Sequence, residues 1–151
     1  MNIEDSRVSK LRSYLFDVIN TLTENRNYQI NTNMLSNKID DYSIDKIPVE
    51  TETEPSWITG TKIKQEVYDF RTRKSYSQDT IVNLNNMGFF EQFENAIETN
   101  NEKGILPDIN GIESIECLSP FTINNSEDGK TATFDTQIKI SYRKDDINGT
   151  I

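Results

Sequence analysis

Histidine is absent from the 151-residue chain, and cysteine occurs only once, at Cys117. The missing imidazole removes Ser-His-Asp and Cys-His catalysis, zinc motifs built on paired histidines and every imidazole proton shuttle. A single cysteine excludes an intramolecular disulfide and a zinc site made of several thiolates. Because no imidazole is available to activate it, we expect Cys117 to be a small apolar residue of a strand rather than a nucleophile.

Long apolar runs are also missing. No window approaches the roughly 18 apolar residues of a membrane-spanning helix. The first residues, Met1–Asp5, lack the basic start and apolar stretch of a signal peptide. We therefore expect a protein that stays in the cytoplasm of the cell that makes it and has no membrane partner. The Asn-x-Ser/Thr triplets at Asn124 and Asn148 are interpreted as chance matches.

Positive charge is scarce relative to negative charge. The chain has 16 Lys and Arg against 25 Asp and Glu, for a net charge of −9. Such a chain repels phosphates, which argues against a nucleic-acid-binding module. Asp40, Asp41 and Asp45 are clustered but lack the spacing of a calcium-binding loop. No metal and no cofactor is therefore expected, and composition indicates an acidic domain without a recognisable reaction.

Apolar spacing predicts one α+β domain over residues 1–151. An amphipathic helix is expected over 6–24, capped by Asp5 or Ser6, followed by a short strand over 42–47 that Pro48 ends. A long strand is expected over 61–75, and its imperfect alternation favours a bulge or cover on both faces.

A second helical region is expected over 79–102, kinked or broken at Gly88 and stopped by Gly104. The remainder is interpreted as a hairpin, with Cys117 in its first arm, a turn-rich linker over 124–129 and a second arm over 131–143. The fold is thus a twisted, mostly antiparallel sheet with an N-terminal helix and a central helical region packed on it. Its core is predicted to contain Phe93, Ile97, Phe134, Ile138 and Ile140.

Some apolar residues have no evident partner within the domain. Trp57 lies in an aperiodic loop over 50–60, where it either folds back onto the core edge or anchors a partner. Phe90 follows Phe89 on a helix that can bury only one of them fully. The tail over 144–151 is polar and is expected to be extended. The candidate subunit or partner contacts are Trp57, Ile58, Tyr76, Phe90, Ile147 and Ile151.

The order of five segments resembles that of a known family. The segments are Tyr42–Pro48, Arg71–Tyr76, Asn86–Phe93, Asn101–Pro107 and Gln137–Tyr142. Over about residues 8–143, this order is similar to that of the tail terminator or "minor capsid" (head-tail joining) proteins of phages and prophages of Gram-positive bacteria. Related rings occur in headless, phage-tail-like bacteriocins.

The resemblance implies a structural virion component rather than an enzyme. It implies a homo-hexameric ring that ends polymerisation of the tail tube and joins the tail to the head connector or collar. The implied partners are the tube protein and, in contractile tails, the sheath. DNA would pass through the lumen without specific binding, and an acidic wall suits such a passage because it repels phosphates. The implied location is the virion or tail-like particle, assembled in the cytoplasm of the bacterial host.

Three alternatives stay open at this point. A head-completion or connector protein is closely related in role. A tail-tube subunit would need long self-complementary strands, and only 131–143 is long and regular. An acidic inhibitor that binds a basic partner belongs to a different class. The acidic residues of this chain are interleaved with Lys and Arg, which disfavours that interpretation.

Overall fold

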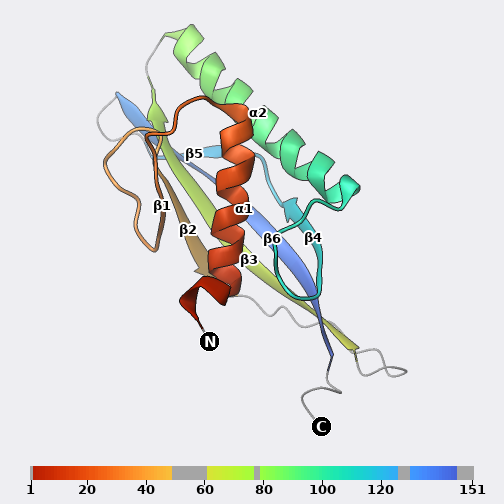
Figure 1. Ribbon diagram of the computed structural model, residues 1–151. Helices are drawn as coiled ribbons and strands as arrows, with labels where there is room; N and C mark the ends of the chain where they lie inside the picture. Colours follow the sequence, from red (N-terminus) through yellow and green to blue (C-terminus); the bar gives the residue numbers. More distant parts are fainter. Residues whose placement is uncertain (1, 49–60, 77–78, 126–129, 146–151) are drawn as a thin grey trace.

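Two fifteen-residue strands, β3 (Thr61–Ser75) and β6 (Thr131–Asp145), form the centre of the sheet. They pair antiparallel along their whole length, from Thr61 opposite Asp145 to Ser75 opposite Thr131. The computed structural model describes residues 2–48, 61–76, 79–125 and 130–145 (Figure 1). The predicted bounds of β3 are confirmed. Of the two explanations for its imperfect alternation, the bulge is wrong, because the register of β3 with β6 is unbroken.

Shorter strands flank this central pair. On one side, β2 (Tyr42–Ile47) pairs antiparallel with β3, and β1 (Ile30–Thr32) pairs parallel with β2. On the other side, β4 (Ile112–Cys117) and β5 (Thr122–Asn125) both pair with β6. The register shifts occur in these last two edge strands, which have a partner on one side only. The result is an open, six-stranded, mixed and mostly antiparallel sheet of an α+β fold, as predicted.

Helix α1 (Arg7–Leu22) begins where the sequence places its cap. The Ser6 hydroxyl accepts a hydrogen bond from the Ser9 amide at 3.3 Å, which satisfies one of the free N–H groups of the first turn. The apolar spacing then turns one face onto the sheet, and the buried residues of the helix are Leu11, Tyr14, Leu15, Val18 and Ile19. A short 3-10 turn (Ile3–Asp5) precedes the helix.

Helix α2 (Thr80–Lys103) crosses the same face of the sheet as α1 (Figure 1). Asp79 caps it by accepting from the Ile81 amide, and Gly104, with φ of 75°, ends it in the left-handed conformation that favours glycine. The helix continues through Gly88, so the predicted break is wrong. A single helical glycine costs about 1 kcal/mol against alanine, which is too little to end a helix that packing holds further along.

The core lies between the two helices and one face of the sheet. Aromatic rings run through it in a chain, with Tyr42 stacked on Phe70 and Phe70 stacked on Phe93, each at 5.4 Å between centroids. Four of the five predicted core residues are buried: Phe93, Ile97, Ile138 and Ile140. Phe134 is only half-buried, which corrects that prediction, because it lies near the start of β6, where the Phe90 ring covers it in part.

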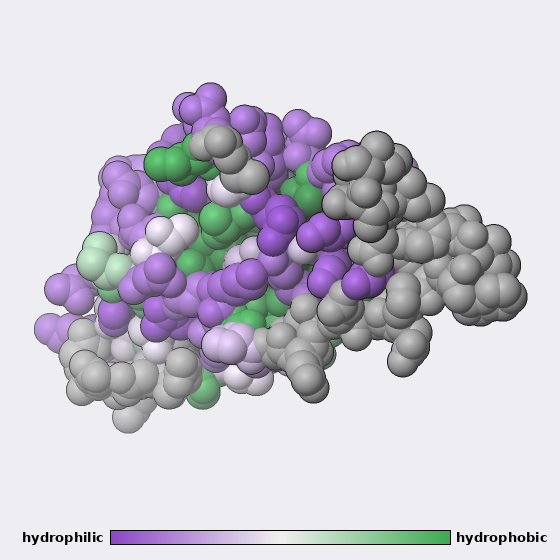
Figure 2. Space-filling view, turned by 90° about the horizontal axis from the view of Figure 1, so that it is seen from below, coloured by the Kyte–Doolittle hydropathy of each residue, from purple (hydrophilic) through white to green (hydrophobic). Residues whose placement is uncertain are grey.

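Two strands were not predicted. β1 has three residues and β5 has four, so neither is long enough to display a two-residue alternation. Asn124 and Asn125, expected in a linker, end β5, and Lys144 and Asp145, expected in the extended tail, end β6. Viewed from below, the molecule is mostly hydrophilic, with smaller apolar patches between the polar side chains (Figure 2).

Candidate functional site

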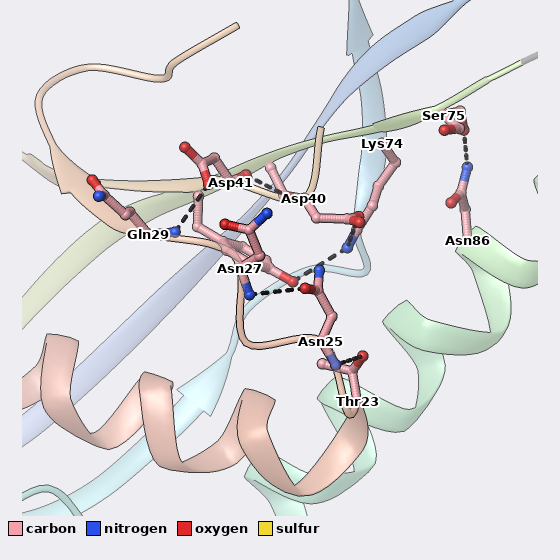
Figure 3. A network of polar contacts seen from close by, with 11 residues as sticks. Thr23, Asn25, Asn27, Gln29, Asp40, Asp41, Lys74, Ser75 and Asn86 are labelled. Carbon is pink, nitrogen blue, oxygen red and sulfur yellow. Dashed lines mark hydrogen bonds and ion pairs between the residues drawn. The ribbon is translucent and has the colours of Figure 1, made fainter. Parts of the chain in front are cut away.

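A buried lysine organises the end of the sheet where β3 meets the 33–41 loop (Figure 3). Lys74 is 7% exposed, and its Nζ donates to Asp40 Oδ1 at 3.0 Å and to the Tyr42 hydroxyl at 3.2 Å. The same ammonium lies 4.2 Å from the centroid of the Phe89 ring, at cation–π distance. Burial lowers the pKa of Lys74 because it removes water from the charge, and Asp40 opposes that effect.

The neighbouring carboxylate, Asp41, fixes the loop itself. Its two oxygens accept from the Gln29 amide at 2.9 Å and from the Ser36 hydroxyl at 2.7 Å. Asp40 has a φ of 70° and donates its own amide to the Arg73 carbonyl. The aspartates that are adjacent in sequence therefore have separate partners, and no three side chains of metal-ligating type converge within the described part of the chain.

The turns around this loop are held by further polar contacts (Figure 3). The Asn25 amide donates to the Thr23 hydroxyl at 3.2 Å, and the Asn27 amide donates to Asn25 Oδ1 at 2.8 Å. At the other side, Asn86 on α2 donates to the Ser75 carbonyl at 2.6 Å. The first two contacts shape the turn that follows α1, and the third fastens the first part of α2 to β3.

A second ionic centre lies at Glu66 of β3, which is 5% exposed. Arg7 binds it with two nitrogens, at 2.9 and 2.8 Å, and Lys46 Nζ reaches it at 2.8 Å. The Tyr68 hydroxyl completes the set at 2.9 Å. Burial alone would raise the pKa of Glu66, but the hydrogen bonds from Arg7, Lys46 and Tyr68 outweigh it and lower the pKa to about 2. This carboxylate ties α1 and β2 to β3.

A third cluster occupies the sheet face opposite the helices. Asp45 lies opposite Asp69 in register, and Arg71 lies opposite Asp135. Arg71 Nη2 contacts Asp45 Oδ2 at 2.5 Å, whereas its Nε stays 3.8 Å from Asp69 Oδ2. Two carboxylates thus share one guanidinium, and a third acid, Asp135, lies opposite Arg71 in the sheet.

This shortage of positive charge has its clearest effect on the pKa of Asp69. Burial, followed by the hydrogen bond and the repulsion from Asp135, raises the pKa of Asp69 to about 7. The buried Oδ1 of Asp69 receives no hydrogen bond from the described residues. Both observations are accounted for if Asp69 holds a proton that it donates to Asp135, since like charges at this separation resist joint ionisation.

Cys117 lies on β4 and is half-buried. Burial, with smaller contributions from Glu94 and Glu116, raises the pKa of its thiol to about 12. The thiol therefore stays protonated at neutral pH, where only the thiolate is nucleophilic.

An exposed apolar surface lies on the first part of α2. None of the residues of Thr80–Phe89 is buried, and the buried residues of the helix begin at Phe90. Ile81, Leu84 and Met87 are 68%, 57% and 65% exposed. They are three residues apart and share one side of the helix, which we name the α2 stripe. The spacing of Ile81 and Leu84 in the sequence is also that of a core face, so spacing alone does not reveal that they are exposed.

Of the residues predicted to contact partners, two lie in the described part of the chain. Tyr76 is half-buried just after β3, and its amide donates to the Lys130 carbonyl at 2.8 Å. Phe90 is 5% exposed and stacks on Phe121 at 4.4 Å between centroids, so the expectation that it lies outside the core is wrong. The remaining predicted contacts lie outside the described residues: Trp57, Ile58, Ile147 and Ile151.

The chain was compared with known proteins. A scan against models of protein families finds no match, and a search of curated proteins finds none either. Among the described helices, none combines the length and the apolar character needed to cross a membrane.

Proposed function

We propose that this chain is a structural subunit whose copies form a ring at the head-proximal end of a phage or phage-like tail tube. The ring ends tube polymerisation and joins the tail to the connector or collar. The observation that carries the proposal is the ordered set of sequence segments similar to those of tail terminator proteins. In the fold these segments occupy β2, the end of β3, the middle and end of α2, and β6.

The use of polar groups supports a structural role. Lys74, Glu66 and Asp41 are buried, and each is engaged by partners from other elements. Such contacts fix loops and strands relative to one another. The α2 stripe, by contrast, is an apolar surface that stays exposed in the described part of the fold. An uncovered apolar surface of this kind is typical of a protein-protein contact.

A ring imposes two demands on its subunit. Each copy needs two different patches, because a cyclic contact with more than two copies is head-to-tail. A passage for DNA also needs a wall that does not hold phosphates, and the net charge of −9 suits that requirement. The partners in this role are further copies of the chain, the tube protein, the sheath of a contractile tail, and the connector.

The proposal is tested by deleting the gene and measuring tail lengths in micrographs of the particles. We expect tails of uncontrolled length, unattached to heads where heads exist, with normal length restored by a plasmid copy. Tails of normal length that fail to join heads would reject tube termination and assign the chain to the connector. Mass measurement of the purified protein provides a second readout, in which the expected assembly contains six copies.

A further inference from the structure

The α2 stripe lies on a part of the helix that carries no charge. Between Asp79 and Glu91 the sequence contains only neutral residues, although charged residues make up 27% of the chain. Figure 1 shows these first turns of α2 beyond the end of α1. The three side chains of the stripe are each more than half exposed. Water therefore surrounds an apolar surface that would gain free energy from being covered.

Gly88 lies on the same side of α2 as the stripe, four residues after Leu84 and seven after Ile81. A Cβ atom placed at Gly88 would meet no other part of the fold within 4 Å, so alanine would fit here. Glycine destabilises the interior of a helix relative to alanine. No contact within the described fold requires this glycine, whereas a missing side chain allows a second helix to approach the backbone closely.

The charge of the chain indicates what covers this surface. Two copies of a chain with a net charge of −9 repel each other where their acidic surfaces meet. A basic partner would be recognised by carboxylates, which the first part of α2 does not have. A neutral apolar surface instead allows like-charged copies to meet without repulsion at the contact. The composition of this surface therefore favours a second copy of the chain as its occupant.

The second part of α2 sets the direction in which two copies would pack. Glu91, Glu98 and Glu102 are exposed there, and steps of seven and four residues keep them on one side of the helix. Two parallel helices would place each of these carboxylates opposite its own copy, and like charges at such positions repel. Antiparallel packing avoids this, because it places the acidic parts of the two helices at opposite ends of the pair.

We propose that the α2 stripes of two copies pack against each other as antiparallel helices that cross at Leu84. Ile81 of each copy then lies opposite Met87 of the other, because both are three residues from the crossing point. Gly88 lies next to this point and lets the two backbones approach. The acidic part begins at Glu91, seven residues from the crossing point, and α2 itself begins only four residues before that point. The acidic part of each helix therefore extends past the start of the other helix.

The contact is small and closes on two copies. Residues 80–90 span about 16 Å of a helix about 10 Å wide, so their whole lateral surface is about 500 Å². Stable complexes bury about 800 Å² on each partner, so we expect a weak pair whose population depends on concentration. A contact between two copies of one surface is complete at two. It is thus distinct from the head-to-tail contacts of the proposed ring and does not rest on them.

The test is sedimentation of the full chain at concentrations up to about 1 mM, because a contact of this size is weak. Any rings are first removed by gel filtration. Wild-type protein should form dimers, and more of them at about 500 mM salt than at about 50 mM, because salt screens the repulsion between acidic copies. The variants L84K and L84E should each weaken association about tenfold or more. An equimolar mixture should associate better than either variant alone, since lysine then faces glutamate at the crossing point.

Two further sets of variants separate association from folding. T99K and T99E place the same charges on an exposed residue of the second part of α2, so they should associate like wild type. Gly88→Ala should raise the melting temperature by about 2 to 4 degrees, because alanine favours the helix. It should nevertheless weaken association, because its methyl group keeps the two helices apart. A glycine without a role in contact between copies would give only the first effect.

Several results would overturn the proposal. Wild-type protein that stays monomeric at the highest concentration and salt would assign the stripe to a different protein. L84K and L84E that associate normally, with native circular dichroism, would place the contact outside the stripe. A mixture that associates no better than either variant would reject the antiparallel crossing at Leu84. None of these results bears on tube termination, because tail length in a strain that carries L84K tests the proposed function separately.

Discussion

Lys74 and Asp40 form an ion pair of 3.0 Å in which the lysine is buried and the aspartate is partly exposed. The two partners are therefore not equivalent. Removing the ammonium leaves a carboxylate that water can reach, whereas removing the carboxylate leaves a desolvated ammonium without its counter-ion. Breaking a buried pair is costly chiefly when it strands a charge.

Asp40→Asn should accordingly destabilise the fold more than Lys74→Met. We expect about 2 kcal/mol for Asp40→Asn, because asparagine tolerates the positive φ but does not neutralise Lys74. Lys74→Met keeps an unbranched side chain against Tyr42 and Phe89 and should cost less than about 1 kcal/mol. Urea unfolding of both variants measures the difference. Equal losses of stability in the two variants would show that the lost attraction of the ion pair sets the cost, rather than the charge left without a partner.

Acid should weaken the fold through Glu66. The pKa of Glu66 is about 2 in the folded chain against 4.5 for the free side chain. Its contribution to the stability of the fold is therefore fully present above pH 4.5. That contribution is lost as the pH falls from about 5 toward 2, because the unfolded chain then binds the extra proton. The full shift of the Glu66 pKa corresponds to about 3 kcal/mol of unfolding free energy. Urea unfolding at several pH values measures it, and Glu66→Gln should flatten the dependence in this window.

Asp69 should make the stability of the fold depend on pH in the opposite direction. Its pKa is raised to about 7 from 3.8, so the folded state binds the proton more tightly than the unfolded state. The stability it contributes is present below about pH 4 and is lost as the pH rises through about 7. Side-chain carboxyl NMR should show that Asp69 titrates near neutrality. Asp69→Asn should remove that titration, and a normal acidic titration of Asp69 in the wild-type protein would contradict the prediction.

The core offers a graded test of burial. Phe93 is fully buried, and Phe134 is half-buried against Phe90. Phe93→Ala should therefore cost about 4 kcal/mol and Phe134→Ala about 2 kcal/mol, since the loss grows with the buried volume removed. Thermal unfolding of both variants decides the order. A larger loss at Phe134 would mean that the start of β6 is covered more fully than this fold shows.

How much of this fold could be predicted depends on the range of the contacts involved. Both helices, β2, β3 and β6 follow from local spacing and capping, which sequence displays directly. The choice between Phe89 and Phe90 does not, because both lie within one helical turn of Phe93. Phe121 and Phe134 decide it by stacking on Phe90 from distant parts of the chain.

The candidate site was harder to predict for the same reason. Lys74 is buried only because Asp40, Tyr42 and Phe89 converge on it from three segments. An isolated lysine in a strand ordinarily indicates an exposed position. The apolar spacing of α2 likewise predicts a buried face over its whole length. It does not reveal that the packed part begins at Phe90, because that depends on where the helix crosses the sheet.

A single substitution in the α2 stripe separates folding from assembly. Leu84 is 57% exposed, so Leu84→Gln should change the free energy of unfolding by less than about 0.5 kcal/mol. Association should nevertheless weaken, because an exposed apolar surface of this kind is where we expect the subunit to contact its partners. Urea unfolding measures the first effect, and sedimentation measures the second. A variant that keeps its stability and associates as well as wild type would show that the contact between copies lies elsewhere.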